Sequence, residues 1–216
     1  TLTGGLFEID KDIISLVTTN TYRLAYSQMN IEKDLEEEYK VILPGTTLNE
    51  LHHLIGNDIE KIEIFINNSY VRFNYRDIIF ISRLIEGKFP NYRQVLPDNF
   101  KSIVKVDRIG LLNAVRRVSL IARLDSNVIS LKIDRDRMSI DSSSSEYGKA
   151  HEIIEVELEG PEQSIDIDAD YIIDVLKVLE DETVKLLLNG PLNALSVKKE
   201  SDDNYIYLIM PVRPGS

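Results

Sequence analysis

The chain has 216 residues, of which 43% are hydrophobic, and it carries no cysteine and a formal net charge of −11. Disulfides and cysteine-based metal sites are therefore excluded, and the composition predicts a protein of the reducing cytoplasm. No apolar run approaches the roughly 18 residues of a membrane-spanning helix, and the negative charge taken alone argues against nucleic-acid binding, which Lys and Arg drive.

The first half of the chain predicts strands and one short helix. Pro44-Gly45 breaks the chain, and Thr46 or Thr47 is expected to cap a helix that ends at Gly56. Leucines at helical spacing, beginning with Leu48, give this helix one apolar side. Alternating apolar residues predict strands at 6–10, 12–18, 22–29, 40–43, 61–67, 70–75 and 77–84.

The second half begins after a segment, 89–97, whose two prolines predict a stiff, extended linker. Asp107 is expected to cap a long helix at 108–122 with Ile109, Leu112, Val115 and Val118 or Ser119 on its apolar side. The serine run 142–145 is interpreted as a loop. A second helix is expected at 171–179, capped by Asp170, and strands at 101–106, 128–134, 137–142, 151–159, 164–167, 183–188, 194–199 and 205–210.

Three segments of the first half return in the second half. The matches pair Ile9-Asp10-Lys11-Asp12 with Ile133-Asp134-Arg135-Asp136, Leu48–Leu51 with Ile173–Leu176 and, more loosely, Asn74–Phe80 with Asn204–Leu208. A spacing near 125 residues indicates tandem copies of one α+β unit rather than a short-repeat solenoid. Only the second copy has a strand and a long helix before its first hairpin, so we expect the chain to be a fragment that lacks them in its first copy.

Three motifs resemble the bacterial DNA polymerase III beta subunit family, the sliding clamps. The segment 19–25 (Thr-Asn-Thr-Tyr-Arg-Leu-Ala) is similar to a family motif, 87–97 to the interdomain segment and 207–213 to the C-terminal tail. The resemblance implies an α+β fold built of tandem clamp domains, with helices on one side of antiparallel sheets. It places the middle domain, without its first strand and helix, at 1–92 and the C-terminal domain at 93–216.

The function that the resemblance implies is that of a replication processivity factor without catalytic activity or cofactor. The family forms a head-to-tail homodimeric ring around double-stranded DNA and tethers the DNA polymerase III alpha subunit, the clamp loader and other proteins that carry a clamp-binding motif. Such a ring holds DNA topologically, so modest positive charge inside and an acidic exterior suffice. We expect the fragment alone to be a monomer.

A peptide-binding cleft is the principal site that the resemblance implies. Its apolar residues would form an adaptable floor, and Arg23 and Arg213 would meet carbonyls or an acidic partner. The chain departs from the family pattern at Tyr22, where the family has His, at Thr21 and at Gln94, which alters the expected pocket shape. The cleft residues are Leu2, Thr19, Tyr22, Arg23, Leu24, Pro90, Val95, Tyr171, Ser196, Leu208, Ile209, Met210, Pro211, Val212 and Arg213.

Two further surfaces are expected on the long helix. Arg116 and Arg117 share a polar stripe with Asn113 at helical spacing, and the residues expected to face DNA phosphates are Arg108, Arg116, Arg117 and Lys177. The dimer contact is expected at Leu120 and Ile121, with an edge strand near 151–157.

Two alternatives remain open at this point. The carboxylates Asp166, Asp168 and Asp170, with Asp134 and Asp136, are compatible with an acidic metal-dependent hydrolase, because alternate strand residues share one face. No calcium-loop, phosphate-loop or nucleophile motif accompanies them. The second alternative is a two-domain interaction scaffold without a DNA role.

Overall fold

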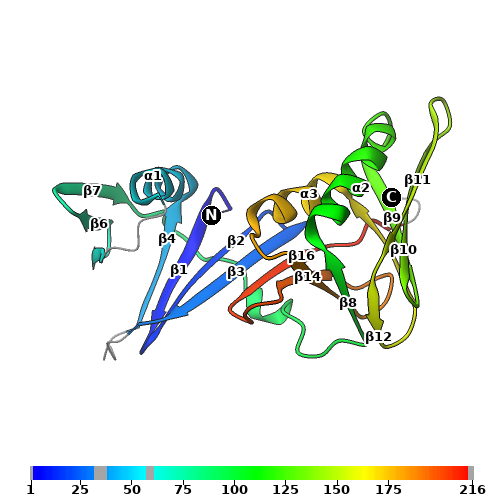
Figure 1. Cartoon of the computed structure of the whole chain (residues 1–216). Coiled ribbons are helices and arrows are strands. Elements are labelled where there is room, and N and C mark those ends of the chain that lie inside the picture. Colours follow the sequence, from blue (N-terminus) through cyan, green and yellow to red (C-terminus); the bar gives the residue numbers. More distant parts are fainter. Residues whose placement is uncertain (1, 32–37, 57–60, 214–216) are drawn as a thin grey trace. The chain divides into compact units, whose positions relative to one another are not determined.

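The structure is a computed structural model that describes residues 2–31, 38–56 and 61–213, and it divides the chain into two compact units (Figure 1). Unit 1 comprises Thr1–Asn20 and Tyr26–Arg93, and unit 2 comprises Thr21–Ala25 and Gln94–Ser216. No helix in the described part of the chain is long and apolar enough to cross a membrane.

Unit 1 contains two small antiparallel sheets and one helix. The first sheet has the order β3-β2-β1-β4, and the second has the order β5-β6-β7. Helix α1 packs against β1 and β4, and Leu51 of this helix joins a core with Phe7, Val71 and Phe73. The elements are β1 (Gly4–Asp10), β2 (Ile13–Thr19), β3 (Arg23–Asn30), β4 (Tyr39–Pro44), α1 (Gly45–Ile55), β5 (Glu63–Ile66), β6 (Tyr70–Tyr75) and β7 (Ile78–Arg83).

Unit 2 has two larger sheets and two helices around a single core. One sheet runs β12-β8-β14-β15-β16, and the other runs β11-β10-β9-β13. Helices α2 and α3 lie side by side, and α2 also packs on β9, β10 and β11 (Figure 1). The elements are β8 (Ser102–Asp107), α2 (Arg108–Ala122), β9 (Val128–Asp134), β10 (Arg137–Ser144), β11 (Gly148–Glu155), β12 (Glu157–Glu159), β13 (Gln163–Asp168), α3 (Ala169–Val178), β14 (Thr183–Leu188), β15 (Leu195–Lys199) and β16 (Tyr205–Ile209).

The topology confirms that the two units are copies of one α+β fold. The order β3-β2-β1-β4 of unit 1 corresponds to β11-β10-β9-β13 of unit 2, and β5-β6-β7 corresponds to β14-β15-β16. Lys11 and Arg135, which the first sequence match aligns, both adopt a left-handed backbone in equivalent hairpin turns, with φ of 54° and 48°. The third match was out of register, because Asn74 and Tyr75 lie in β6 whereas Tyr205 begins β16.

Four local predictions were wrong. The helix α1 begins at Gly45 without a side-chain cap, and the Thr47 hydroxyl instead lies 2.6 Å from that of Ser82. Asp168, not Asp170, caps α3 by accepting from the backbone N–H of Asp170. Ile109 is exposed rather than part of the apolar side of α2. The serine run 142–145 is largely strand, because the backbone of 142–144 pairs with 148–150 of β11.

The predicted strand 151–159 is two strands in different sheets. Residues up to Glu155 pair with β10, and residues from Glu157 pair with β8. Val156 lies between them, is buried, and donates its backbone N–H to the carbonyl of Asp136. The chain therefore passes from the edge of one sheet to the edge of the other within one residue.

A buried carboxylate in unit 1 binds the segment that was predicted to be an extended linker. This segment contains a 3-10 turn at Tyr92–Gln94. The Glu8 carboxylate accepts from the Tyr92 hydroxyl at 2.6 Å and pairs with the Lys40 ammonium at 2.7 Å and with Arg93 at 3.4 Å. Burial raises the pKa of the Glu8 carboxyl, but the Lys40 and Tyr92 contacts outweigh burial, so this pKa lies below its usual value. Glu8 is thus an ionised group that fixes Tyr92 and Arg93 on β1.

The Asp107 cap of α2 is confirmed and carries a prediction. Its carboxylate accepts from the Gly110 N–H at 2.6 Å, so one of the unpaired donors in the first turn is satisfied. We expect Asp107→Ala to lower the unfolding free energy of unit 2 by about 1 kcal/mol in urea titrations. Asp125→Ala, beyond the other end of the same helix, should change it by less than about 0.5 kcal/mol, and equal losses would contradict the capping role.

Candidate functional site

Among the predicted cleft residues, Arg23 of unit 2 makes several side-chain contacts. The Arg23 Nη1 donates to Oδ2 of Asp174 at 2.7 Å and to the hydroxyl of Tyr207 at 3.2 Å. Its guanidinium lies 4.7 Å from the centroid of the Tyr171 ring, which is within cation–π range. The Arg23 guanidinium of β3 therefore lies beside two phenol rings, that of Tyr171 on α3 and that of Tyr207 on β16.

Electrostatics favour a charged Arg23 and a neutral Tyr207. Burial lowers the pKa of Arg23, but the hydrogen bonds that Arg23 donates to Asp174 and Tyr207 outweigh burial, so the guanidinium remains charged. Burial raises the pKa of the Tyr207 phenol, and the nearby Arg23 opposes this only in part. The phenol therefore stays neutral at physiological pH and can accept from Arg23.

The other predicted cleft residues of unit 2 include both buried and exposed side chains. Leu24, Ser196, Leu208 and Ile209 are buried, and Ser196 pairs with Leu208 across β15 and β16. Met210 donates its backbone N–H to the carbonyl of Tyr22 at 2.8 Å. The side chains of Tyr22, Val95 and Met210 are 64%, 50% and 42% exposed, so these apolar groups are accessible to solvent.

The remaining cleft residues are distributed over both units. Leu2, Thr19 and Pro90 belong to unit 1, where Leu2 and Pro90 are exposed and Thr19 ends β2. In unit 2, the backbone N–H of Val212 donates to Asp166, Pro211 is half-buried and Arg213 is exposed. Sequence reasoning missed Asp174 and Tyr207. The i, i+3 spacing of Tyr171 and Asp174 on a helix was a usable signal for Asp174.

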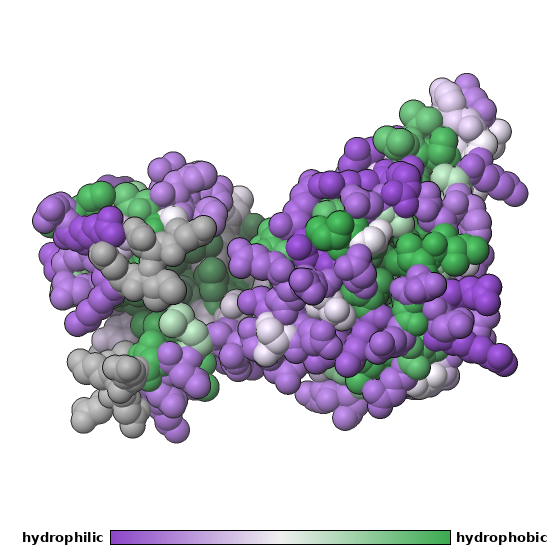
Figure 2. Space-filling model, in the orientation of Figure 1, coloured by the Kyte–Doolittle hydropathy of each residue, from purple (hydrophilic) through white to green (hydrophobic). Residues whose placement is uncertain are grey.

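The four residues expected to face DNA differ in what they contact. Arg116 and Lys177 are exposed, whereas Arg117 forms a two-pronged pair with Glu152 at 2.8 and 2.9 Å. Arg108 donates to the carbonyl of Leu176 in the last turn of α3 and to that of Asp181 just beyond the helix, so its guanidinium links the start of α2 to the end of α3. Figure 2 shows mainly hydrophilic side chains on the visible face, interrupted by hydrophobic patches.

The region expected to make the dimer contact exposes apolar side chains. Leu120 on α2 is exposed and Ile121 is half-buried, and β11 is an edge strand of its sheet. Leu124 and Ile153, which the sequence did not single out, are also exposed on or beside these elements. Exposed leucine and isoleucine near an unpaired strand edge are typical of a protein interface.

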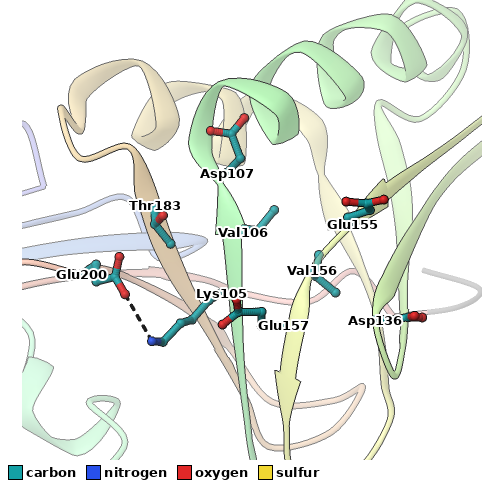
Figure 3. A pocket seen from close by; sticks show the side chains of 9 residues that line it. All are labelled: Lys105, Val106, Asp107, Asp136, Glu155, Val156, Glu157, Thr183 and Glu200. Atoms are coloured by element: carbon teal, nitrogen blue, oxygen red, sulfur yellow. Dashed lines mark ion pairs between the residues drawn. The ribbon is translucent and has the colours of Figure 1, made fainter.

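An acidic pocket of about 650 Å³ lies elsewhere on unit 2, between the start of α2, the junction of β11 and β12 and the residues after β15 (Figure 3). Among the described residues that line it, Lys105 is the one basic residue, and it pairs with Glu200 at 3.2 Å. The pocket overlaps the end of the edge strand expected near 151–157, through Glu155, Val156 and Glu157, and its other described lining residues belong to none of the predicted cleft, DNA or dimer sites. The lining residues are Lys105, Val106, Asp107, Asp136, Glu155, Val156, Glu157, Thr183 and Glu200.

Two of the five carboxylates that suggested a hydrolase, Asp168 and Asp170, are engaged in structural contacts. Asp168 caps α3, and Asp170 accepts from Arg123 at 2.6 Å and from Asn127 at 3.1 Å. Within the described ranges, no group of three or more His, Asp or Glu side chains is arranged to hold a metal ion. The geometry gives the hydrolase alternative no support.

Models of two neighbouring protein domains match the chain. The central domain of the DNA polymerase III beta subunit matches residues 1–91, and its C-terminal domain matches residues 93–213. The chain is 31% identical over 214 residues to the beta sliding clamp of Staphylococcus aureus and 30% identical over 215 residues to that of Bacillus subtilis. These matches cover 98% of the chain and 56% and 57% of the relatives, so the chain spans little more than half of their length.

Solved structures of sliding clamps are also similar to the chain. The DNA polymerase sliding clamp of Bacillus subtilis is similar with a TM-score of 0.92 at 30% identity, covering 98% of this chain and 57% of that one. A sliding clamp from Pseudomonas aeruginosa bound to griselimycin is similar with a TM-score of 0.91 at 27% identity, with the same coverage. The similarity therefore extends through both units.

Proposed function

Because the chain belongs to the DNA polymerase III beta subunit family, we propose that it supplies two domains, at 1–92 and 93–216, of a sliding clamp for DNA replication. The clamp encircles double-stranded DNA without reading its sequence and tethers polymerases to it. It catalyses no reaction. The observation that carries this proposal is the match of both units, in order, to the central and C-terminal clamp domains.

The partners follow from the same proposal. The surface around Arg23 and Met210 binds the short motif of the DNA polymerase III alpha subunit, the clamp loader and other motif-bearing proteins. Arg116 and Lys177, which are exposed on α2 and α3, contribute positive charge toward DNA phosphates. Full-length clamps dimerise through the region of Leu120, Ile121 and β11, whereas the present chain alone is a monomer. The exposure of Met210, Arg116, Lys177 and Leu120 supports the respective assignments.

The test is fluorescence anisotropy with a labelled clamp-binding peptide from a bacterial replicative polymerase. We expect saturable binding in the micromolar range, as is usual for a small interface. Met210→Ala and Arg213→Ala should each weaken it by about tenfold or more, because truncated anchors of a small interface carry most of its energy.

The chain offers a matched control for the first variant. Met29 is exposed on β3, at 58%, and is not among the predicted peptide contacts. Met29→Ala should leave the dissociation constant unchanged. Absence of binding to the unaltered chain, or equal losses in Met29→Ala and Met210→Ala, would contradict the proposed peptide site.

A further inference from the structure

Arg23 of the proposed peptide surface already forms an ion pair with a carboxylate of the chain itself, that of Asp174. Asp174 lies on α3, one turn after Tyr171, and its Oδ2 accepts from Arg23 Nη1 at 2.7 Å. The side chain of Asp174 is 50% exposed and that of Arg23 is 32% exposed. The ion pair is therefore reached by solvent and by any molecule that binds beside Tyr171.

The chemistry of this pair decides which peptides the surface accepts. A guanidinium is the preferred protein group for binding a carboxylate, because its planar donors match both oxygens. Here a carboxylate of the chain itself already holds one of those donors. An acidic side chain of a partner must either break the Arg23–Asp174 ion pair or lie close to the negative charge of Asp174, and both cost binding free energy. A neutral side chain incurs neither cost.

We propose that Asp174 is a specificity-determining residue of the peptide surface, which makes it select partner motifs without a carboxylate near Arg23. This inference rests on the proposed peptide-binding function. Asp174 acts through Arg23 and not as an anchor of the peptide. The exposed Tyr22, Val95 and Met210 remain the contacts for the apolar part of the motif.

The variant Asp174→Asn separates charge from geometry. Its amide oxygen can still accept from Arg23, so the guanidinium keeps its place over the Tyr171 ring, while the negative charge is removed. The matched control is Glu180→Gln, which removes one negative charge from an exposed residue just beyond the same helix.

The experiment measures anisotropy with a set of peptides in which glutamate replaces a neutral residue at one motif position at a time. For the position beside Arg23, we expect Asp174→Asn to reduce the glutamate penalty, the ratio of the two dissociation constants, by about fivefold at low ionic strength. The neutral peptide should bind as before, Glu180→Gln should leave the ratio unchanged, and high salt should diminish the effect.

Two results would overturn the inference in different ways. The glutamate penalty could be the same in the unaltered chain and in Asp174→Asn, or the variant could weaken the binding of every peptide by the same factor. Either result would make Asp174 a purely structural partner of Arg23. Failure of the unaltered chain to bind any peptide would contradict the proposed function itself, and the specificity role with it.

Discussion

Leu176→Ala is expected to lower the unfolding free energy of unit 2 by about 3 kcal/mol, because it removes a fully buried side chain from a close-packed core. Leu176 lies on α3, in the cluster that joins this helix with α2 and both sheets of the unit. Its backbone carbonyl, which accepts from Arg108, is retained in the variant. The loss should therefore reflect the cavity alone.

The measurement is urea unfolding, with hydrogen exchange by mass spectrometry to assign the change to unit 2. Val178→Ala, two residues later on the same helix and 72% exposed, should cost less than about 0.5 kcal/mol. Similar losses for the two variants would show that α3 is not packed as described. Faster hydrogen exchange that is confined to unit 1 in Leu176→Ala would also contradict the described packing of α3.

Glu8→Gln is expected to lower the unfolding free energy of unit 1 by about 2 kcal/mol at neutral pH, because it removes a charged acceptor from the buried Tyr92 hydroxyl. The Lys40 ammonium would also lose its partner at 2.7 Å. Glu50→Gln, which alters an exposed carboxylate on α1, should have little effect.

The same variant carries a pH dependence with a defined sign. The pKa of the Glu8 carboxyl is lower in the folded than in the unfolded chain, so its contribution is fully present above the unfolded value, near 4.5. That contribution disappears as pH falls through the lower, folded-state pKa. Stability differences between the unaltered chain and Glu8→Gln should therefore shrink in acid, and a difference that is constant down to strongly acidic pH would contradict an ionised Glu8.

Local signals in the sequence were sufficient for most hairpins and for the long helix. The turns at Lys11 and Arg135 and the cap at Asp107 depend on residues adjacent in the chain, and the structure confirms them. The strand at Ser142–Ser144 was missed because serine has no strong strand preference, and its backbone pairing depends on β11. The α1 cap was misjudged because the Thr47 hydroxyl contacts Ser82, 35 residues away.

The candidate site was harder to predict than the fold. Arg23 was found through its resemblance to a family motif, but its partners Asp174 and Tyr207 lie 151 and 184 residues away. Arg108 was assigned to DNA from its charge, although its guanidinium donates to carbonyls in the last turn of α3 and just beyond it. Charge and spacing indicate which side chains are available for a site, whereas tertiary contacts decide which of them already have partners.

The passage of the chain through Val156 has an energetic consequence for unit 2. β11 and β12 are the edge strands of the two sheets, and this single buried residue joins them. Separating either strand from its sheet at this junction would expose the buried Val156 side chain to solvent, which costs free energy in addition to the backbone hydrogen bonds. β12 has only three residues, so the buried Val156 anchors this short strand at the point where it continues from the eight-residue β11.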